Sequence, residues 1–211
     1  MTEAEWRTAT EPTPMLEFLR DKASERKMRL FVCGICRRHE RQIATFGFPE
    51  TLEAIEQYAD GLISQEELTT VSRTRLAPWH VVGRTNRTRQ HAHSVLYRLM
   101  HSNEPMFLVA TIALQGFSGK KAAVRRGRTR LLREIFDNPF RPVVFSRDWR
   151  TDTALTLASQ MYESRDFSAM PILADALQDA GCDSADILDH CRGPGPHVRG
   201  CWVVDLVLGK T

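Results

Sequence analysis

The sequence lacks the patterns by which membrane and secreted proteins are recognised. Its longest apolar run, Met106–Leu114, falls far short of the roughly 20 apolar residues that a membrane helix needs. The opening stretch MTEAEWRTATEP is polar and acidic, and no basic segment followed by an apolar one is present, as a secretory signal would require. We therefore expect a cytoplasmic protein with no membrane partner.

Cysteine is scarce and its count is odd. Five cysteines occur in 211 residues, which cannot all pair within one chain and do not form the dense framework of a disulfide-rich domain. A chain of this length can bury a hydrophobic core without such cross-links. We expect the thiols to be reduced, in keeping with a cytoplasmic location.

Motifs that carry common chemistry are also missing. The chain has no G-x-S-x-G, no HExxH and no EF-hand spacing among its C-terminal acidic residues. Residues Gly116–Lys120 resemble part of a phosphate-binding loop, but they lack the first glycine at the right spacing, and the lysine is followed by a second lysine. No set of residues supplies nucleophile, base and charge stabiliser together. The sequence leaves enzymatic activity open but favours a protein that is not an enzyme.

What is present is typical of a helical globular protein. Hydrophobic residues make up 42% and charged residues 26% of the chain, with a formal net charge of +3. Capping boxes occur at Thr2–Glu5 and Ser64–Glu67, and apolar residues between Met28 and Cys36 recur at helical spacing. These patterns predict an all-α fold, a compact array of about nine or ten helices with at most a minor strand at Phe140–Phe145.

The organisation along the chain follows from composition and turn signals. We expect an N-terminal helical region over 1–116, a basic segment over 117–130 and a C-terminal helical block over 131–211, or else one continuous domain. Residues Thr74–Arg89 combine proline, glycine, threonine and asparagine, and we interpret them as a loop. After the Gly193–Pro196 break, the spacing within Val198–Leu208 favours a helix over a strand.

Both ends of the chain carry long, specific motifs. They read MTEAEW and PMLEFLRDKASERKMRLFVCGICRR near the start, and LLREIFDNPFRPV and PILADALQDAGCDSADILDHCRGPGPHVRGCWVVDLVLGK near the end. The chain resembles in these motifs a bacterial protein family associated with planctomycetes, whereas roughly Glu50–Gly127 shows no such likeness. The stretch PILADALQDAG is also similar to short helical companion repeats of such proteins. This resemblance implies an interaction module, and it carries over no activity and no site residue.

Two groups of thiols and imidazoles could bind a metal. Cys33-x-x-Cys36 is followed by His39, and a second group surrounds the Gly-Pro-Gly-Pro turn with His190 beside it. Zinc needs four such ligands in a tetrahedral arrangement, usually as two pairs from separate elements. Cysteines on an apolar helical stripe are more often small buried hydrophobes, so that we expect no cofactor. The alternative is a zinc site; its candidate ligands are Cys33, Cys36, Cys191, His197 and Cys201.

A basic stretch is the candidate for nucleic-acid binding. It consists of Lys120, Lys121, Arg125, Arg126, Arg128, Arg130 and Arg133, with no acid before Glu134. On a helix, Arg126, Arg130 and Arg133 fall on one side, and such a row could neutralise phosphates. Basic helix faces are commonly only solvated, balanced here by acidic segments elsewhere in the chain, and we favour that interpretation.

The sequence thus favours a non-enzymatic helical interaction or regulatory protein with an unknown protein partner. One alternative is a nucleic-acid-binding accessory protein that uses the basic stretch. The other alternative is a zinc-stabilised helical scaffold.

Overall fold

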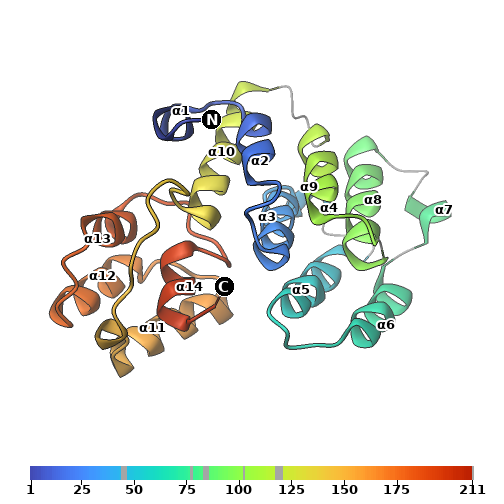
Figure 1. The fold of residues 1–211 in the computed structure, drawn as a ribbon. Coiled ribbons are helices and arrows are strands. Elements are labelled where there is room, and N and C mark those ends of the chain that lie inside the picture. The colour runs from blue at the N-terminus through green and yellow to red at the C-terminus, as the bar shows by residue number, and fades with distance from the viewer. Residues whose placement is uncertain (44–46, 77, 83–85, 102, 117–120, 211) are drawn as a thin grey trace. The chain divides into compact units, whose positions relative to one another are not determined.

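A computed structural model describes the chain except for residues 44–46, 77, 83–85, 102, 117–120 and 211 (Figure 1). Its described part is all-α, with eleven α-helices of seven residues or more, three shorter ones and no strand. The all-α prediction is confirmed, and the number of helices is higher than predicted. No helix of the described part is both long and apolar enough to cross a membrane.

The chain forms two compact units. The first comprises Met1 and Thr8–Leu132, and the second comprises Thr2–Arg7 and Arg133–Thr211. Helix α10 (Ala122–Phe136) contains the boundary between them. The second unit is therefore built from the beginning and the end of the sequence.

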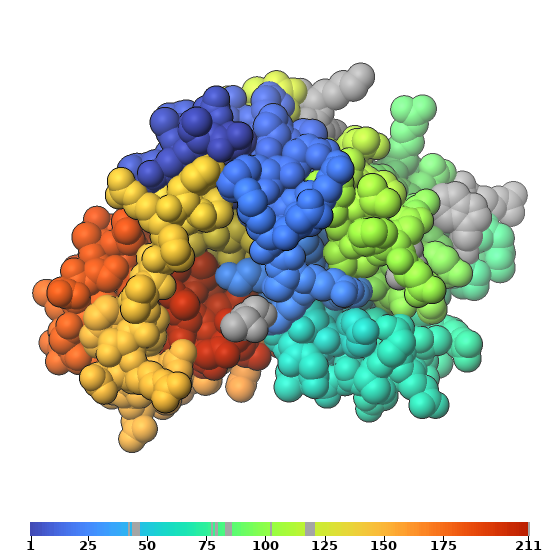
Figure 2. Space-filling model, in the orientation of Figure 1, coloured from blue at the N-terminus to red at the C-terminus, as the bar shows by residue number. Residues whose placement is uncertain are grey.

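The first unit holds the helices between α1 and α10 together with most of α10 itself. They are α2 (Pro12–Leu19), α3 (Glu25–Arg37), α4 (Glu40–Ile43), α5 (Phe48–Ala59), α6 (Gln65–Arg75), α7 (Trp79–Val82), α8 (Arg87–His101) and α9 (Met106–Gln115). Helix α3 is central, because it packs against both α5 and α9 and buries the apolar stripe seen in the sequence. The side chains of α5 and α6 form one continuous surface in the space-filling view (Figure 2).

Local sequence signals account for the helix ends of this unit. Ser24 Oγ accepts a hydrogen bond from Lys27 N, and the capping box of Ser64 and Glu67 is complete. Gly47 has a positive φ of 74°, and a Cβ there would lie 1.8 Å from the carbonyl oxygen of Arg75, so that only glycine fits. The loop interpretation of Thr74–Arg89 is wrong in part, because this range includes α7, the last residues of α6 and the first residues of α8.

The second unit packs four helices around one core. These helices are α11 (Asp152–Ser164), α12 (Met170–Asp179), α13 (Ala185–Arg192) and α14 (Trp202–Leu208). The unit also contains a short 3-10 turn at Arg147–Trp149 and α1 (Glu3–Thr8), except for the last residue of α1, which belongs to the first unit. Helix α14 packs against α11, and α12 packs against α13. The helix predicted within Val198–Leu208 is confirmed as α14, and Phe140–Phe145 contains no strand.

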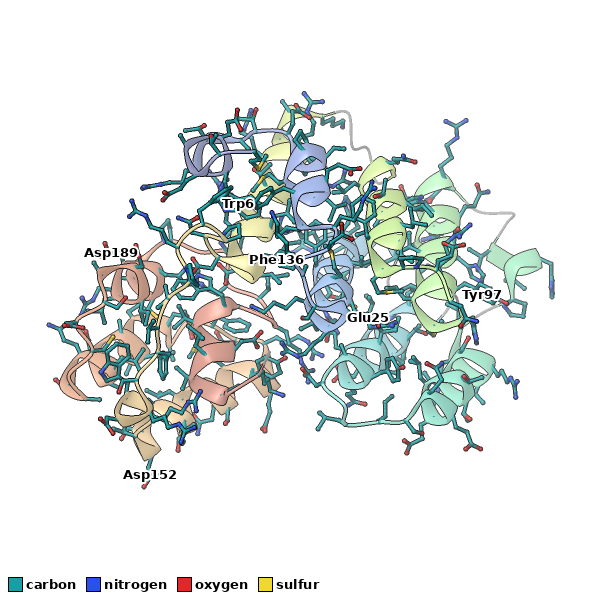
Figure 3. The ribbon with its side chains drawn as sticks, viewed as in Figure 1. Trp6, Glu25, Tyr97, Phe136, Asp152 and Asp189 are labelled. Atoms are coloured by element: carbon teal, nitrogen blue, oxygen red, sulfur yellow. The ribbon has the colours of Figure 1, made fainter. Side chains whose placement is uncertain are left out.

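Trp6 of α1, labelled in Figure 3, fastens the N-terminal helix to the rest of the second unit. Its side chain is 1% exposed, and its indole Nε1 donates to the carbonyl oxygen of Asp137 at 3.0 Å. The guanidinium of Arg133 donates in turn to the carbonyl oxygen of Trp6, at 3.0 Å from Nε and 2.7 Å from Nη2. The capping box of Thr2 and Glu5 is present as predicted.

Candidate metal centre

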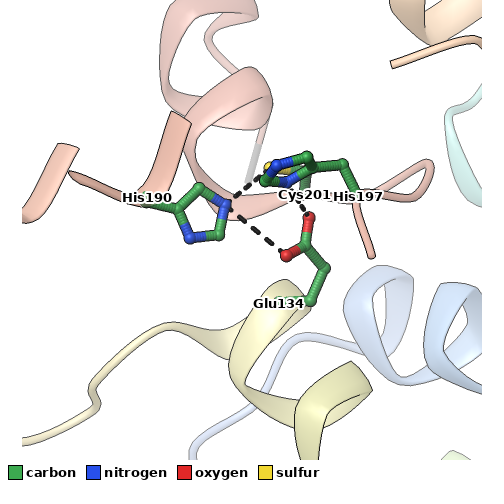
Figure 4. A group of neighbouring side chains, drawn as sticks. All are labelled: Glu134, His190, His197 and Cys201. Atoms are coloured by element: carbon green, nitrogen blue, oxygen red, sulfur yellow. Dashed lines mark hydrogen bonds and ion pairs between the residues drawn. The ribbon is translucent and has the colours of Figure 1, made fainter. Parts of the chain in front are cut away.

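Four side chains with metal-binding atoms converge inside the second unit (Figure 4). They are Glu134 from the last turn of α10, His190 from the last turn of α13, His197 from the following loop and Cys201 at the start of α14. One ligand atom from each lies within 4.8 Å of every other. The set combines two imidazoles, a thiol and a carboxyl group, all of which are zinc ligands.

The sequence around the loop explains how His197 reaches the cluster. Gly195 has a positive φ of 68°, and a Cβ at this residue would lie 2.8 Å from the backbone nitrogen of His197. A side chain at Gly195 is therefore excluded by both strain and contact. The loop then returns to α14, whose N-cap residue is Cys201, so that two ligands enter from one short segment.

The distances between the ligand atoms suit a bound ion. His190 Nε2 lies 3.2 Å from Cys201 Sγ and 3.5 Å from Glu134 Oε2, and His197 Nδ1 lies 3.1 Å from Glu134 Oε1. Ligands of a tetrahedral zinc ion at bond lengths of about 2.0–2.3 Å are themselves separated by roughly 3.3–3.8 Å. The three separations, 3.1–3.5 Å, overlap that range only at its lower end, and no pair of ligand atoms is more than 4.8 Å apart.

The site is buried, and its charges are arranged around one carboxylate. Glu134 is 5% exposed and Cys201 is fully buried. Burial raises the pKa of Glu134, but hydrogen bonds from His190 and His197 outweigh this effect, and the pKa lies below its ordinary value. Burial, with Glu134 beside it, raises the pKa of the Cys201 thiol well above its ordinary value. A coordinated metal ion reverses this effect, because it deprotonates a thiol outright.

The residues also satisfy one another in a network of hydrogen bonds without an ion. The carboxylate of Glu134 can accept from His190 Nε2 and from His197 Nδ1, and the thiol of Cys201 lies against the same group. His197 Nε2 is buried and has no hydrogen-bond partner among the described residues.

The four donor groups are ones that zinc binds, and their number indicates whether the site is structural or catalytic. A divalent ion with one carboxylate, one thiolate and two neutral imidazoles carries no net charge, which suits a buried position. Four protein ligands fill all the positions of a tetrahedral ion. Structural zinc sites are closed in this way, whereas catalytic ones keep a position open for water or substrate.

The structure brings together two of the five metal ligands predicted from the sequence, His197 and Cys201. Cys191 lies buried in the core of the same unit but is not part of the cluster. Cys33 and Cys36 are fully buried on α3 in the first unit, and the cluster draws on the second unit alone. Burial raises the pKa of Cys36 to about 12, in keeping with thiols that pack as small hydrophobes.

Sequence reasoning missed two of the four side chains as ligands. His190 stands next to Cys191 in the sequence, and its spacing from His197 and Cys201 was a usable signal. Glu134 gives a subtler one, because it lies between Leu132 and Ile135, both buried. A carboxylate within the apolar stripe of a helix needs a buried partner.

Only some side chains of the basic stretch are exposed and could contact phosphates. Arg128 is 3% exposed, donates to the carbonyl oxygens of Leu114 and Gly116, and has a pKa lowered to about 10 by burial and by Arg38. Arg125 pairs with Glu11 at 2.6 Å.

The remaining basic side chains differ in exposure. Arg133, predicted to face solvent, is half-buried and donates to Trp6, as described above. Lys121, Arg126 and Arg130 are exposed, and Lys120 lies outside the described residues. The exposed face of α10 is therefore shorter than the sequence suggests.

Comparison with known proteins adds no further constraint. No protein-family profile, no curated protein and no solved structure matches the chain.

Proposed function

We propose that the chain is a zinc-stabilised helical scaffold that acts by binding a protein partner and not by catalysis. The observation that supports this is the closed, buried group of Glu134, His190, His197 and Cys201, whose ligand atoms lie within 4.8 Å of one another. A zinc ion with four protein ligands has no open position, as in structural sites. The proposal includes a cytoplasmic location and membership of the bacterial family that the terminal motifs resemble.

The absence of an open ligand position supports a structural role over a catalytic one. Each of the four groups is supplied by the protein, and three of them come from the short segment that runs from the last turn of α13 to the start of α14. An ion here would fasten that segment to the end of α10 through Glu134. Its effect would be to fix the surface formed by these helices, which is what an interaction module requires.

Metal analysis of the purified protein tests the proposal. Protein prepared without chelators should contain about one zinc ion per chain. Cobalt in place of zinc should give the absorption of a tetrahedral site with a thiolate-to-metal band. The variants His197→Asn and Cys201→Ser should lose the metal, whereas Cys182→Ser should keep it, because Cys182 is a buried thiol of the same unit outside the cluster. A chain free of metal in every preparation, and unable to bind added zinc, would refute the proposal.

A further inference from the structure

Trp202 makes an unusual contact with the proposed centre. Its indole Nε1 donates a hydrogen bond to His190 Nδ1 at 3.0 Å, and the two rings are tilted by 60° with centroids 4.9 Å apart. An indole nitrogen can only donate a hydrogen bond. The bond therefore fixes Nδ1 of His190 as an acceptor that carries no proton, and the proton of the neutral ring sits on Nε2.

This proton arrangement is the opposite of the one that a metal ligand requires. Nε2 of His190 is the atom that faces Cys201 and Glu134, and it can bind an ion only through a free lone pair. Histidines that bind metals usually donate their other ring N–H to a carboxylate, a carbonyl oxygen or water. Trp202 offers a donor where an acceptor would support the metal.

A small pocket opens beside the same hydrogen bond. It has a volume of about 200 Å³, and its walls include His190 and Trp202 together with the carboxylates of Asp137 and Asp186. All its lining residues belong to the second unit. The pocket gives His190 access to solvent, and its lining also includes the cationic side chains of Arg7, Arg133 and Arg141.

We infer that the centre is exchangeable, with two states in which a metal ion on His190 Nε2 and the hydrogen bond from Trp202 to His190 Nδ1 exclude one another. In the metal-free state Glu134 is held by its neighbours and the unit stays folded. In the loaded state the proton of His190 moves to Nδ1, and the indole N–H of Trp202 must turn away. The inference rests on the proposed zinc site and concerns its regulation.

Zinc affinity in two tryptophan variants tests the inference. Trp202→Phe removes the competing donor and should bind zinc more tightly than the wild type, by up to about tenfold, which is the usual worth of one hydrogen bond. Trp149→Phe is the matched control, because Trp149 packs against the same core without touching the cluster, and its affinity should not change. Competition with a chromophoric zinc indicator at constant pH measures both.

The outcomes separate this inference from the proposed function. No zinc binding by the wild type would refute the proposed site and this inference together. Zinc binding by the wild type, with Trp202→Phe no tighter than Trp149→Phe, would refute the exchange alone.

A measurement on the wild type tests the inference without relying on the folding of a variant. Nitrogen-15 NMR of the histidine rings reports which nitrogen carries the proton. The His190 proton should be on Nε2 without metal and on Nδ1 once zinc is added. A proton already on Nδ1 in the metal-free protein would overturn the inference. Retention of helical circular dichroism after chelation is the second expected result, and unfolding on chelation would likewise overturn it.

Discussion

Glu134 and His197 meet at 3.1 Å, Oε1 to Nδ1, although 63 residues separate them in the chain. One lies at the end of an arginine-rich helix and the other in a glycine- and proline-rich loop. Their contact joins the end of α10 to the C-terminal helices through a buried carboxylate.

Replacing Glu134 by glutamine should abolish tight zinc binding. The amide removes the charge that balances the ion and presents N–H donors where the imidazoles also donate. Even groups that only support a ligand change metal affinity by about 10–100-fold, so the loss of a ligand itself should be at least about 100-fold. The exposed Glu163 of α11 provides the control, since Glu163→Gln should leave affinity unchanged. Equal affinities in the two variants would remove Glu134 from the site.

Cys33 and Cys36 should resist alkylation in the native protein. Burial raises the pKa of Cys36 to about 12 and that of Cys33 well above its ordinary value, so that almost no thiolate is present near neutral pH. Peptide mass spectrometry after brief treatment with iodoacetamide should find both unmodified, and both should react fully in denaturant. Rapid modification under native conditions would show that α3 is more accessible than its packing indicates.

Stability should fall between about pH 7 and pH 5 because of two histidines in the first unit. Burial lowers the pKa of His91; the hydrogen bond with the backbone of Ala113 opposes this in part, and the charge of Arg128 lowers the pKa further. Burial and Arg73 lower that of His101. Both folded pKa values lie below the unfolded value of 6.5, so that the stabilisation is complete above that pH and is lost as the pH falls from it toward the folded values.

Urea unfolding at about pH 7.5 and about pH 5.5 measures this loss. His101→Gln should lose less stability on acidification than the wild type. His80→Gln, at an exposed position of α7, should behave as the wild type does. Identical pH dependence in all three proteins would show that His101 does not contribute.

Nucleic-acid binding should be absent at about 0.1 M salt, where charges are screened beyond about 10 Å. Arg125, Arg128 and Arg133 are engaged within the protein, which leaves too few exposed cations on α10 for a phosphate-binding row. Gel shifts with single- and double-stranded probes measure this. A salt-sensitive shift that disappears in the double variant Arg126→Glu, Arg130→Glu would instead favour the nucleic-acid alternative.

Helices were predictable from local signals, and the convergence of the ligands was not. The caps at Ser24 and Ser64 depend on neighbouring residues only, and therefore both are visible in the sequence. His197 and Cys201 stood out because they share one short segment. Glu134 joins them only through the packing of α10, which no pattern of nearby residues encodes.

Arg128 is a second residue whose position was not predicted correctly from the sequence. Counted as one of seven cations, it suggested a phosphate contact, but it lies three residues before Leu131 on the buried side of α10. Helical periodicity would have placed Arg128 on that side, but the prediction counted basic residues without regard to their position on the helix. Position on the helix, and not charge, decides which arginines face solvent.

The second unit includes Thr2–Arg7, and Trp6 is fully enclosed there by residues made more than a hundred positions later. A growing chain emerges from the ribosome with its N-terminal residues first. The burial of Trp6 in this unit therefore cannot be completed before Asp137 and the residues that follow it have been synthesised.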